Sequence, residues 1–135
     1  MKKLILLATF SIAIVAVAQN KISVSISGLK NNNGYVMIGL YNKKDAFLNK
    51  TFKGNSVAIT DKKATLVFND IPNGEYAVSF FHDANSNGKM DTNFVGIPKE
   101  SYGASNNAKG FFGPPKYDDA KFLVATDKVI TIKAN

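Results

Sequence analysis

The sequence predicts an all-β domain, a single antiparallel β-sandwich of about seven strands with one long ordered loop. Apolar and polar residues alternate with a period of two through most of residues 19–135, as in strands that bury one face. Asn-Gly, Pro and Asp turn residues separate these segments, and no helical period of useful length follows residue 18. Short strands divided by turns favour a sandwich, with a small closed barrel as the alternative.

The alternating segments each place their apolar side chains on one face. In "KISVSISG", Ile22, Val24 and Ile26 share a face, while Lys21 and Ser23 lie on the other. The segment "YVMIGLYN" is apolar on both faces, which predicts a strand that is covered on both sides. The predicted strands are residues 21–28, 35–42, 55–60, 63–70, 75–83, 121–126 and 128–135.

The connections between the first strands carry their own signals. Residues 33–34 are Asn-Gly, a dipeptide suited to the positive φ angles of a tight hairpin turn. Residues 61–62 are expected to join another strand pair. The segment 43–52 breaks the alternation, and we expect a short helical turn there that directs Phe47 and Leu48 inward.

Residues 1–18 have the pattern of a cleavable export signal. Lys2 and Lys3 precede an apolar run over 4–15, and the small residues of 16–18 place the cut after Ala18. The run is too short for a membrane span, so we expect a periplasmic or secreted protein with no membrane span after cleavage. The remaining 117 residues suffice for one domain, 19–135, which contains no cysteine and so cannot depend on disulfides.

The charge of the chain argues against a nucleic-acid partner. The formal net charge is +7, and removal of the signal leaves about +5. All 17 basic residues are lysines, scattered singly or in pairs through the chain, whereas base recognition relies on the bidentate contacts of arginine. The simplest interpretation is a soluble surface decorated with lysine.

Residues 83–120 form a segment without a convincing strand, far longer than an ordinary connection. Its large apolar side chains favour order, and its Gly and Pro residues permit bends, so we expect an Ω-like excursion folded back over one end of the sandwich. Five aromatic residues could stack on sugar rings or anchor an envelope protein, or could plug the loop onto the sandwich. These are Phe94, Tyr102, Phe111, Phe112 and Tyr117.

The start of this segment, "DANSNGKMD", resembles a calcium-binding loop. Aspartate and asparagine recur at alternate positions, with Gly88 at the sixth for the sharp turn. The twelfth position is Phe94 and not a bidentate glutamate. The predicted ligands are the side chains of Asp83, Asn85, Asn87 and Asp91 and the main-chain carbonyl of Lys89.

Only two formal carboxylates, Asp83 and Asp91, belong to this set, so Ca²⁺ would bind weakly, with a Kd on the order of 10⁻⁴–10⁻³ M. At ten times such a Kd, the ion would stabilise the fold by about 1.4 kcal/mol. Glu100, Asp118 or Asp119 could complete the shell if the long loop folds back. The alternative is that Asn and Asp build consecutive Asx-turns that need no ion.

The stretch "FNDIPNGEYAVSFFHDANSNGKMDTNFVGIPKESYGASNNAKGFFGPPKYDDAKF", residues 68–122, resembles the signature of DUF2141, a family of exported bacterial proteins. The resemblance extends over nearly the whole of 19–135. It implies an immunoglobulin-like or transthyretin-like sandwich and an exported location. The family is uncharacterised, so the resemblance implies no activity and no ligand.

Catalytic signals are weak. His82, a residue of the family pattern, could ligate a transition metal, titrate near neutral pH, or serve as a hydrogen-bonding core group. Ser101 and Ser105 lack the sequence context of an activated nucleophile. Glu100 with Asp118 or Asp119 could in principle serve glycoside hydrolysis. We therefore expect an exported, non-enzymatic module whose loop presents a binding surface, with a purely structural envelope or matrix domain as the alternative.

Overall fold

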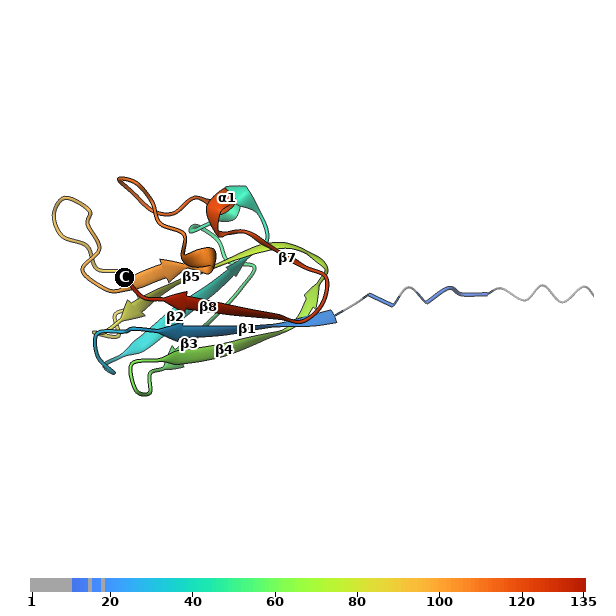
Figure 1. The fold of residues 1–135 in the computed structure, drawn as a ribbon, viewed down its shortest axis with the longest axis horizontal. Coiled ribbons are helices and arrows are strands. Elements are labelled where there is room, and N and C mark those ends of the chain that lie inside the picture. Colours follow the sequence, from blue (N-terminus) through green and yellow to red (C-terminus); the bar gives the residue numbers. More distant parts are fainter. Residues whose placement is uncertain (1–10, 15, 18) are drawn as a thin grey trace, which may run out of the picture.

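The computed structural model describes residues 11–14, 16–17 and 19–135, and residues 19–135 form two packed β-sheets (Figure 1). One sheet has the strand order β4–β1–β8, and the other has the order β3–β2–β5–β6, with β7 also paired to β5. The predicted all-β sandwich is therefore confirmed. The strands are β1 (Gln19–Ser27), β2 (Tyr35–Tyr41), β3 (Lys53–Ala58), β4 (Ala64–Pro72), β5 (Gly74–Asp83), β6 (Tyr102–Ala104), β7 (Phe122–Val124) and β8 (Lys128–Lys133).

The period-two pattern correctly identified the core. Ile22, Val24 and Ile26 of β1 are buried, as are the alternate apolar residues of β2, β5 and β8. These side chains meet between the two sheets, where each fully buried aliphatic group contributes about 1.5–3 kcal/mol relative to exposure. Seven predicted strands match seven observed ones to within a few residues.

Two turns that were expected to close hairpins instead carry the chain from one sheet to the other. Gly34 has the expected positive φ of 66°, yet β1 and β2 lie in different sheets. Residues 61–62 both have positive φ and close a bridge between Thr60 and Lys63, after which β3 and β4 diverge. The alternation of apolar and polar residues identifies the side chains that face the core. A strand in either sheet of a sandwich shows the same alternation, so the pattern does not determine which strands pair.

The sandwich also contains one parallel pair. β8 lies beside β1 in parallel register, from Ile22 opposite Lys128 to Ser27 opposite Lys133, while β4 pairs with the other edge of β1 in antiparallel register. The first and last strands of the described domain are thus joined to each other. Both apolar clusters found among the described residues lie within 19–135.

The segment 83–120 is not a single excursion, contrary to the sequence-based expectation. β6, a 3-10 turn η2 (Ser105–Asn107) and the short helix α1 (Tyr117–Ala120) divide it into two loops, 84–101 and 108–116. β6 has three residues, too few to display a period of two. In Figure 1 both loops extend away from the sheets at the upper left, beyond β5.

The connection between β2 and β3 was predicted in part. A 3-10 turn, η1 (Lys44–Ala46), is present, and Phe47 is buried as expected. Leu48 was wrongly expected to face inward. It adopts a left-handed φ of 63° and is 37% exposed, because the chain turns outward directly after Phe47.

The second face of β2 is covered only at one end. Tyr41 is buried under Phe47 and α1, but Tyr35 at the other end is half exposed, so the expectation of a strand covered on both sides holds for part of its length. The five-stranded sheet therefore has an outer face that is partly packed and partly open.

The predicted export signal, residues 1–18, lies largely outside the described residues. Its described parts, 11–14 and 16–17, have no regular secondary structure, and their side chains are exposed. They extend away from the sandwich, and β1 begins at Gln19 (Figure 1). Within the described ranges, no helix is both long enough and apolar enough to cross a membrane.

Candidate functional site

Asp83 anchors the first loop at the end of β5. Its side chain is buried, and its two carboxylate oxygens accept the backbone N–H groups of Asn87 at 3.0 Å and Gly88 at 2.8 Å. Gly88 has a φ of 75°, the left-handed conformation that its glycine permits. A buried carboxylate that accepts two backbone N–H groups fixes the tight turn predicted for this part of the loop.

Asp91 accepts hydrogen bonds from both predicted asparagine ligands. Its Oδ2 accepts the Nδ2–H of Asn85 at 2.6 Å, and its Oδ1 accepts the Nδ2–H of Asn87 at 2.9 Å. Asn87 is thus bonded to both Asp83 and Asp91. Its own Oδ1 accepts the N–H of Lys89, whose side chain is exposed. The structure brings the four predicted side-chain ligands into one hydrogen-bonded cluster.

Glu100 joins this cluster from the far end of the loop. Its carboxylate accepts the N–H of Ala84 at 3.2 Å and the N–H of Asp91 at 2.9 Å, so it clamps the two ends of the loop together. Asp118 does not join, because it pairs with Lys44 and Lys121 toward the opposite end of β5 from Asp83. Asp119 lies beside it on α1, also away from the loop. Of the three carboxylates considered as additional ligands, only Glu100 reaches the cluster.

The hydrogen bonds that the loop side chains already make determine which of their oxygens could bind a cation. The carboxylate oxygens of Asp83, Asp91 and Glu100 accept amide N–H groups. The side-chain oxygens of Asn85 and Asn87 each accept the backbone N–H two residues further on, the arrangement of consecutive Asx-turns. Each carboxylate oxygen retains a second lone pair, but Asn85 and Asn87 would have to rotate their amides to turn oxygen toward an ion. Within 11–14, 16–17 and 19–135, no three His, Asp or Glu side chains are grouped as a metal site. Calcium binding here stays a prediction.

His82 is a buried histidine that fixes the neighbouring turn. Its Nε2 lies 2.6 Å from the carbonyl oxygen of Asn33, and its backbone N–H donates to the carbonyl of Ser101. A Cβ at Gly34 would lie 1.9 Å from the carbonyl oxygen of Asp83, so the turn packs directly on the start of the loop. This is the geometry of the hydrogen-bonding core histidine considered from the sequence.

The two serines considered as nucleophiles are both buried within the fold. Ser105 is fully buried, and its Oγ accepts the N–H of Val78 at 2.9 Å and donates to the carbonyl of Ala120 at 2.5 Å. It fills the gap in the ladder of β5 between the stretches paired with β6 and β7. Ser101 is also buried, and its Oγ has no hydrogen-bond partner. Sequence reasoning missed the ladder role of Ser105, for which no local signal exists.

The five candidate surface aromatics divide into two groups. Phe94 and Phe112 are fully exposed, and Phe111 is 87% exposed. Phe111 and Phe112 touch each other edge to face, with ring centroids 4.6 Å apart. Tyr102 is half-buried in β6. Tyr117 is only 5% exposed and does not belong to an open surface.

Tyr117 belongs to a small apolar cluster on the outer face of the five-stranded sheet. Phe47 lies between Tyr41 and Tyr117, with ring centroids 5.2 Å and 5.6 Å away, both edge to face. Burial, and then the neighbouring carboxylate of Glu75, raise the pKa of Tyr117 to about 12. This cluster holds α1 against the sheet, and α1 directly follows the second loop, 108–116.

Two hollows lie outside the predicted residues. One, of about 350 Å³, lies on the open part of the same outer face, where Gly54, Gly39 and Ser79 stand in register across β3, β2 and β5, next to the opposed pair Met37 and Phe81. Glycine inside two neighbouring strands was the signal that could have indicated it.

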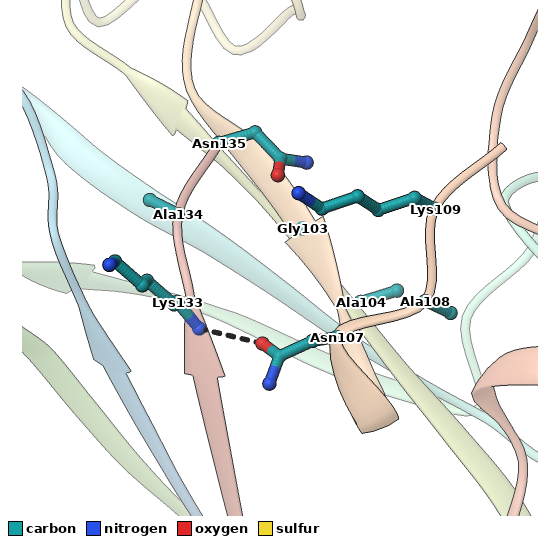
Figure 2. Close-up of a pocket in the computed structure, with 8 residues that line it drawn as sticks. All are labelled: Gly103, Ala104, Asn107, Ala108, Lys109, Lys133, Ala134 and Asn135. Carbon is teal, nitrogen blue, oxygen red and sulfur yellow. Dashed lines mark hydrogen bonds between the residues drawn. The ribbon is translucent and has the colours of Figure 1, made fainter. Parts of the chain in front are cut away.

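The other hollow, of about 290 Å³, lies between η2 and the end of β8, where Asn107 accepts the N–H of Lys133 at 3.0 Å. Figure 2 shows Lys109 extending toward Asn135, while the side chain of Lys133 points to the opposite side. Its eight lining residues include two lysines and no acidic side chain. Neither hollow combines a nucleophile with a base.

Comparison with known proteins gives one match. Residues 24–133 match DUF2141, a family described as "Uncharacterized protein conserved in bacteria". Comparison with curated proteins and with solved structures found no match. Since the matched range covers well over half of the sequence, including seven of the eight strands in full, the chain belongs to the DUF2141 family.

Proposed function

We propose that this protein is an exported, non-enzymatic binding module whose two loops, 84–101 and 108–116, bind a component of the bacterial envelope. One observation carries the proposal. Phe94, Phe111 and Phe112 point into solvent from the ends of these loops, although the sandwich has a well-formed core elsewhere. Exposed clusters of large apolar groups on soluble proteins commonly mark interaction sites.

The first loop supports this proposal because its exposed residues are held by specific bonds. The Oδ1 of Asn93 accepts the N–H groups of Val95 and Ile97 at 3.0 Å and 2.9 Å, and residues 92 and 98 form a bridge. A structure held in this way displays its apolar side chains at a fixed position, which lowers the entropy lost on binding.

Export is supported by the position of the sandwich in the sequence. β1 begins at Gln19, one residue after the predicted cleavage site. The described apolar side chains before it, including Ile12 and Ile14, are exposed and contribute nothing to the core. We expect the mature protein to be periplasmic or secreted with Gln19 at its N-terminus. Cell fractionation with mass spectrometry of the purified protein tests this, and a cytoplasmic protein beginning at Met1 contradicts it.

A non-enzymatic role is supported by the surroundings of the candidate catalytic groups. His82, Ser101 and Ser105 are buried, and Ser105 is bonded within the β5 ladder. Glu100 is engaged by loop amides, whereas Asp118 pairs with Lys44 and Lys121 toward the opposite end of β5.

The proposal includes a weak Ca²⁺ site formed by Asp83, Asn85, Asn87 and Asp91 with the carbonyl of Lys89. Clustering of the four side chains around Asn87 supports it. In this role the ion adds to the bonds that hold the first loop. The alternative, Asx-turns alone, is supported by the side-chain oxygens of Asn85 and Asn87, each of which already accepts the N–H two residues further on. Calcium-dependent stability separates the two.

A purely structural envelope or matrix domain is the second candidate function. The burial of Tyr117 and the partial burial of Tyr102 favour it, since these two aromatics attach the loops to the sandwich. The two candidates differ in what the three exposed phenylalanines do. A structural domain has no use for them, whereas a binding module depends on them.

The test compares residues 19–135 with two variants. Phe94→Ser/Phe111→Ser/Phe112→Ser removes the exposed rings, and Leu123→Thr/Val129→Thr changes two exposed apolar residues of β7 and β8 as a matched control. Each protein is presented to a glycan and peptidoglycan-fragment panel, to solubilised envelope proteins and to lipid vesicles. We expect retention by at least one class, weakened at least tenfold in the triple variant only. Equal retention of the triple variant, or retention by no class, would favour the structural domain.

A further inference from the structure

Each loop ends in a small apolar surface, and we call these two surfaces the apolar tips. The first consists of Phe94, Val95 and Ile97, all more than half exposed, and the second consists of Phe111 and Phe112. Both belong to loops that leave the sandwich on the same side in Figure 1. The apolar tips are the most exposed large apolar groups within residues 19–135 apart from single strand residues.

Most backbone N–H groups of the first tip are satisfied within the loop itself. Asn93 bonds the N–H groups of Val95 and Ile97, its carbonyl accepts the N–H of Gly96 at 2.9 Å, and its own N–H donates to the carbonyl of Ile97 at 2.8 Å. A segment that enters a low-dielectric medium must satisfy its polar backbone groups internally, because water is lost there. The tip meets this requirement for the N–H groups of Val95, Gly96 and Ile97.

The shape of the apolar tips favours some classes of partner over others. Small ligands and sugars need concave sites with convergent polar groups, whereas the side chains of Phe94 and Phe112 are fully exposed and so protrude. The Phe111 and Phe112 rings stand at 67° to each other and form no flat stacking platform. A protruding group of phenylalanine, valine and isoleucine fits a medium that can deform around it.

Exposed lysines lie next to both tips in the sequence. Lys99 follows the first tip by two residues, and Lys109 and Lys116 flank the second. The acidic residues of the first loop, Asp91 and Glu100, are partly buried and bonded to loop amides. A surface that combines apolar side chains with neighbouring ammonium groups is complementary to an anionic bilayer. The apolar groups can enter the acyl chains while the ammonium groups contact the negatively charged headgroups.

We propose that the two apolar tips dock this protein onto an anionic lipid bilayer, with their aromatic and aliphatic side chains among the acyl chains and Lys99, Lys109 and Lys116 at the headgroups. This inference rests on the proposed function, since it names the partner of the same surface. The protein lies on the membrane in this state and does not span it.

Vesicle binding tests the inference. Residues 19–135 are sedimented with vesicles of phosphatidylcholine alone and with vesicles that contain phosphatidylglycerol, in the presence of a chelator so that no divalent ion bridges protein and lipid. We expect binding to the anionic vesicles, weakened by salt. The triple serine variant should bind at least tenfold more weakly, and Lys99→Gln, Lys109→Gln and Lys116→Gln should each weaken binding about fivefold. Leu123→Thr/Val129→Thr should bind as the unchanged protein does.

Single tryptophans locate the contact, because the chain has no tryptophan of its own. Phe94→Trp and Phe112→Trp report on the two tips, and Leu123→Trp on β7 is the control. With anionic vesicles we expect a blue shift of emission and quenching by brominated lipid at positions 94 and 112 but not at 123. Quenching at position 123 alone, or equal binding of the triple serine variant, would overturn the inference.

Failure of this inference can be separated from failure of the proposed function. If the protein binds no vesicle but the triple serine variant loses retention on a glycan or an envelope protein, the lipid partner is wrong and the binding module stands. If no partner of any class depends on the tips, both are wrong.

Discussion

The aromatic side chains of residues 83–120 meet two opposite environments. Tyr117 packs edge to face with Phe47 against the outer face of the five-stranded sheet. Phe111 and Phe112, only a few residues earlier, are almost entirely in solvent. One group packs on the sheet and the other contacts solvent, so aromatic content alone does not distinguish a support from a binding surface. The distinction comes from which residues have a partner on the sheet.

The largest expected effect separates these two groups by stability. Phe47→Ala should lower the free energy of unfolding by about 3 kcal/mol, because it removes the central ring of the outer cluster. Phe94→Ala and Phe112→Ala should each change it by less than about 0.5 kcal/mol. Urea unfolding measures all three. A loss above 1 kcal/mol at Phe112 would show that the second tip packs on the sandwich.

The two buried serines give the next largest contrast. Ser105→Ala leaves the N–H of Val78 and the carbonyl of Ala120 without a partner and should cost about 1–3 kcal/mol of unfolding free energy. Ser101→Ala removes a buried hydroxyl that has no partner, so it should be neutral or slightly stabilising. The pair is matched in burial and in chemistry. Equal destabilisation in urea would contradict the ladder role of Ser105.

Calcium gives a smaller expected effect, restricted to the first loop. At ten times a weak Kd the ion should add about 1.4 kcal/mol, which raises the melting temperature of residues 19–135 by several degrees over the same protein in chelator. Asp83→Ala should abolish that difference, while Asp119→Ala on α1 should preserve it. Melting temperatures that are identical with calcium and with chelator would leave Asx-turns as the complete account of the loop.

The last expected effect, which is absent at neutral pH and develops only above pH 10, is the pH dependence of the buried tyrosine. Its folded-state pKa of about 12 lies above the ordinary value of 10, so Tyr117 contributes stability that is complete below pH 10 and is lost as pH rises through 12. An absorbance titration should show one tyrosine that ionises near pH 12. Tyr117→Phe should remove this step, and persistence of the step in that variant would assign it to Tyr41 or Tyr76, whose pKa values burial also raises.

Strand positions and inward faces could be predicted from the sequence because burial of one face imposes a period of two on residues such as Ile22, Val24 and Ile26. Pairing could not. The turn at residues 33–34 has hairpin chemistry, but its two strands enter different sheets, and the parallel partner of β1 comes from residues 128–133. Such distant pairings leave no local pattern.

The candidate site was predictable to a similar extent. Alternating Asp and Asn residues indicated the clustered loop, and Asp83 and Asp91 do lie in one network. The direction of each aromatic side chain was not predictable, since Tyr117 and Phe112 are equally apolar in sequence. Their difference depends on Phe47, which lies 70 positions before Tyr117 and reaches it only in the folded chain.

Acrylamide quenching of single tryptophans in the free protein tests the central claim most directly, namely that the loop ends are exposed while their supports are buried. Phe94→Trp and Phe112→Trp should be quenched almost as strongly as free tryptophan, whereas Tyr117→Trp should be strongly protected. Protection at positions 94 and 112 equal to that at 117 would mean that both loops fold back onto the sandwich, and the proposed binding surface would not exist.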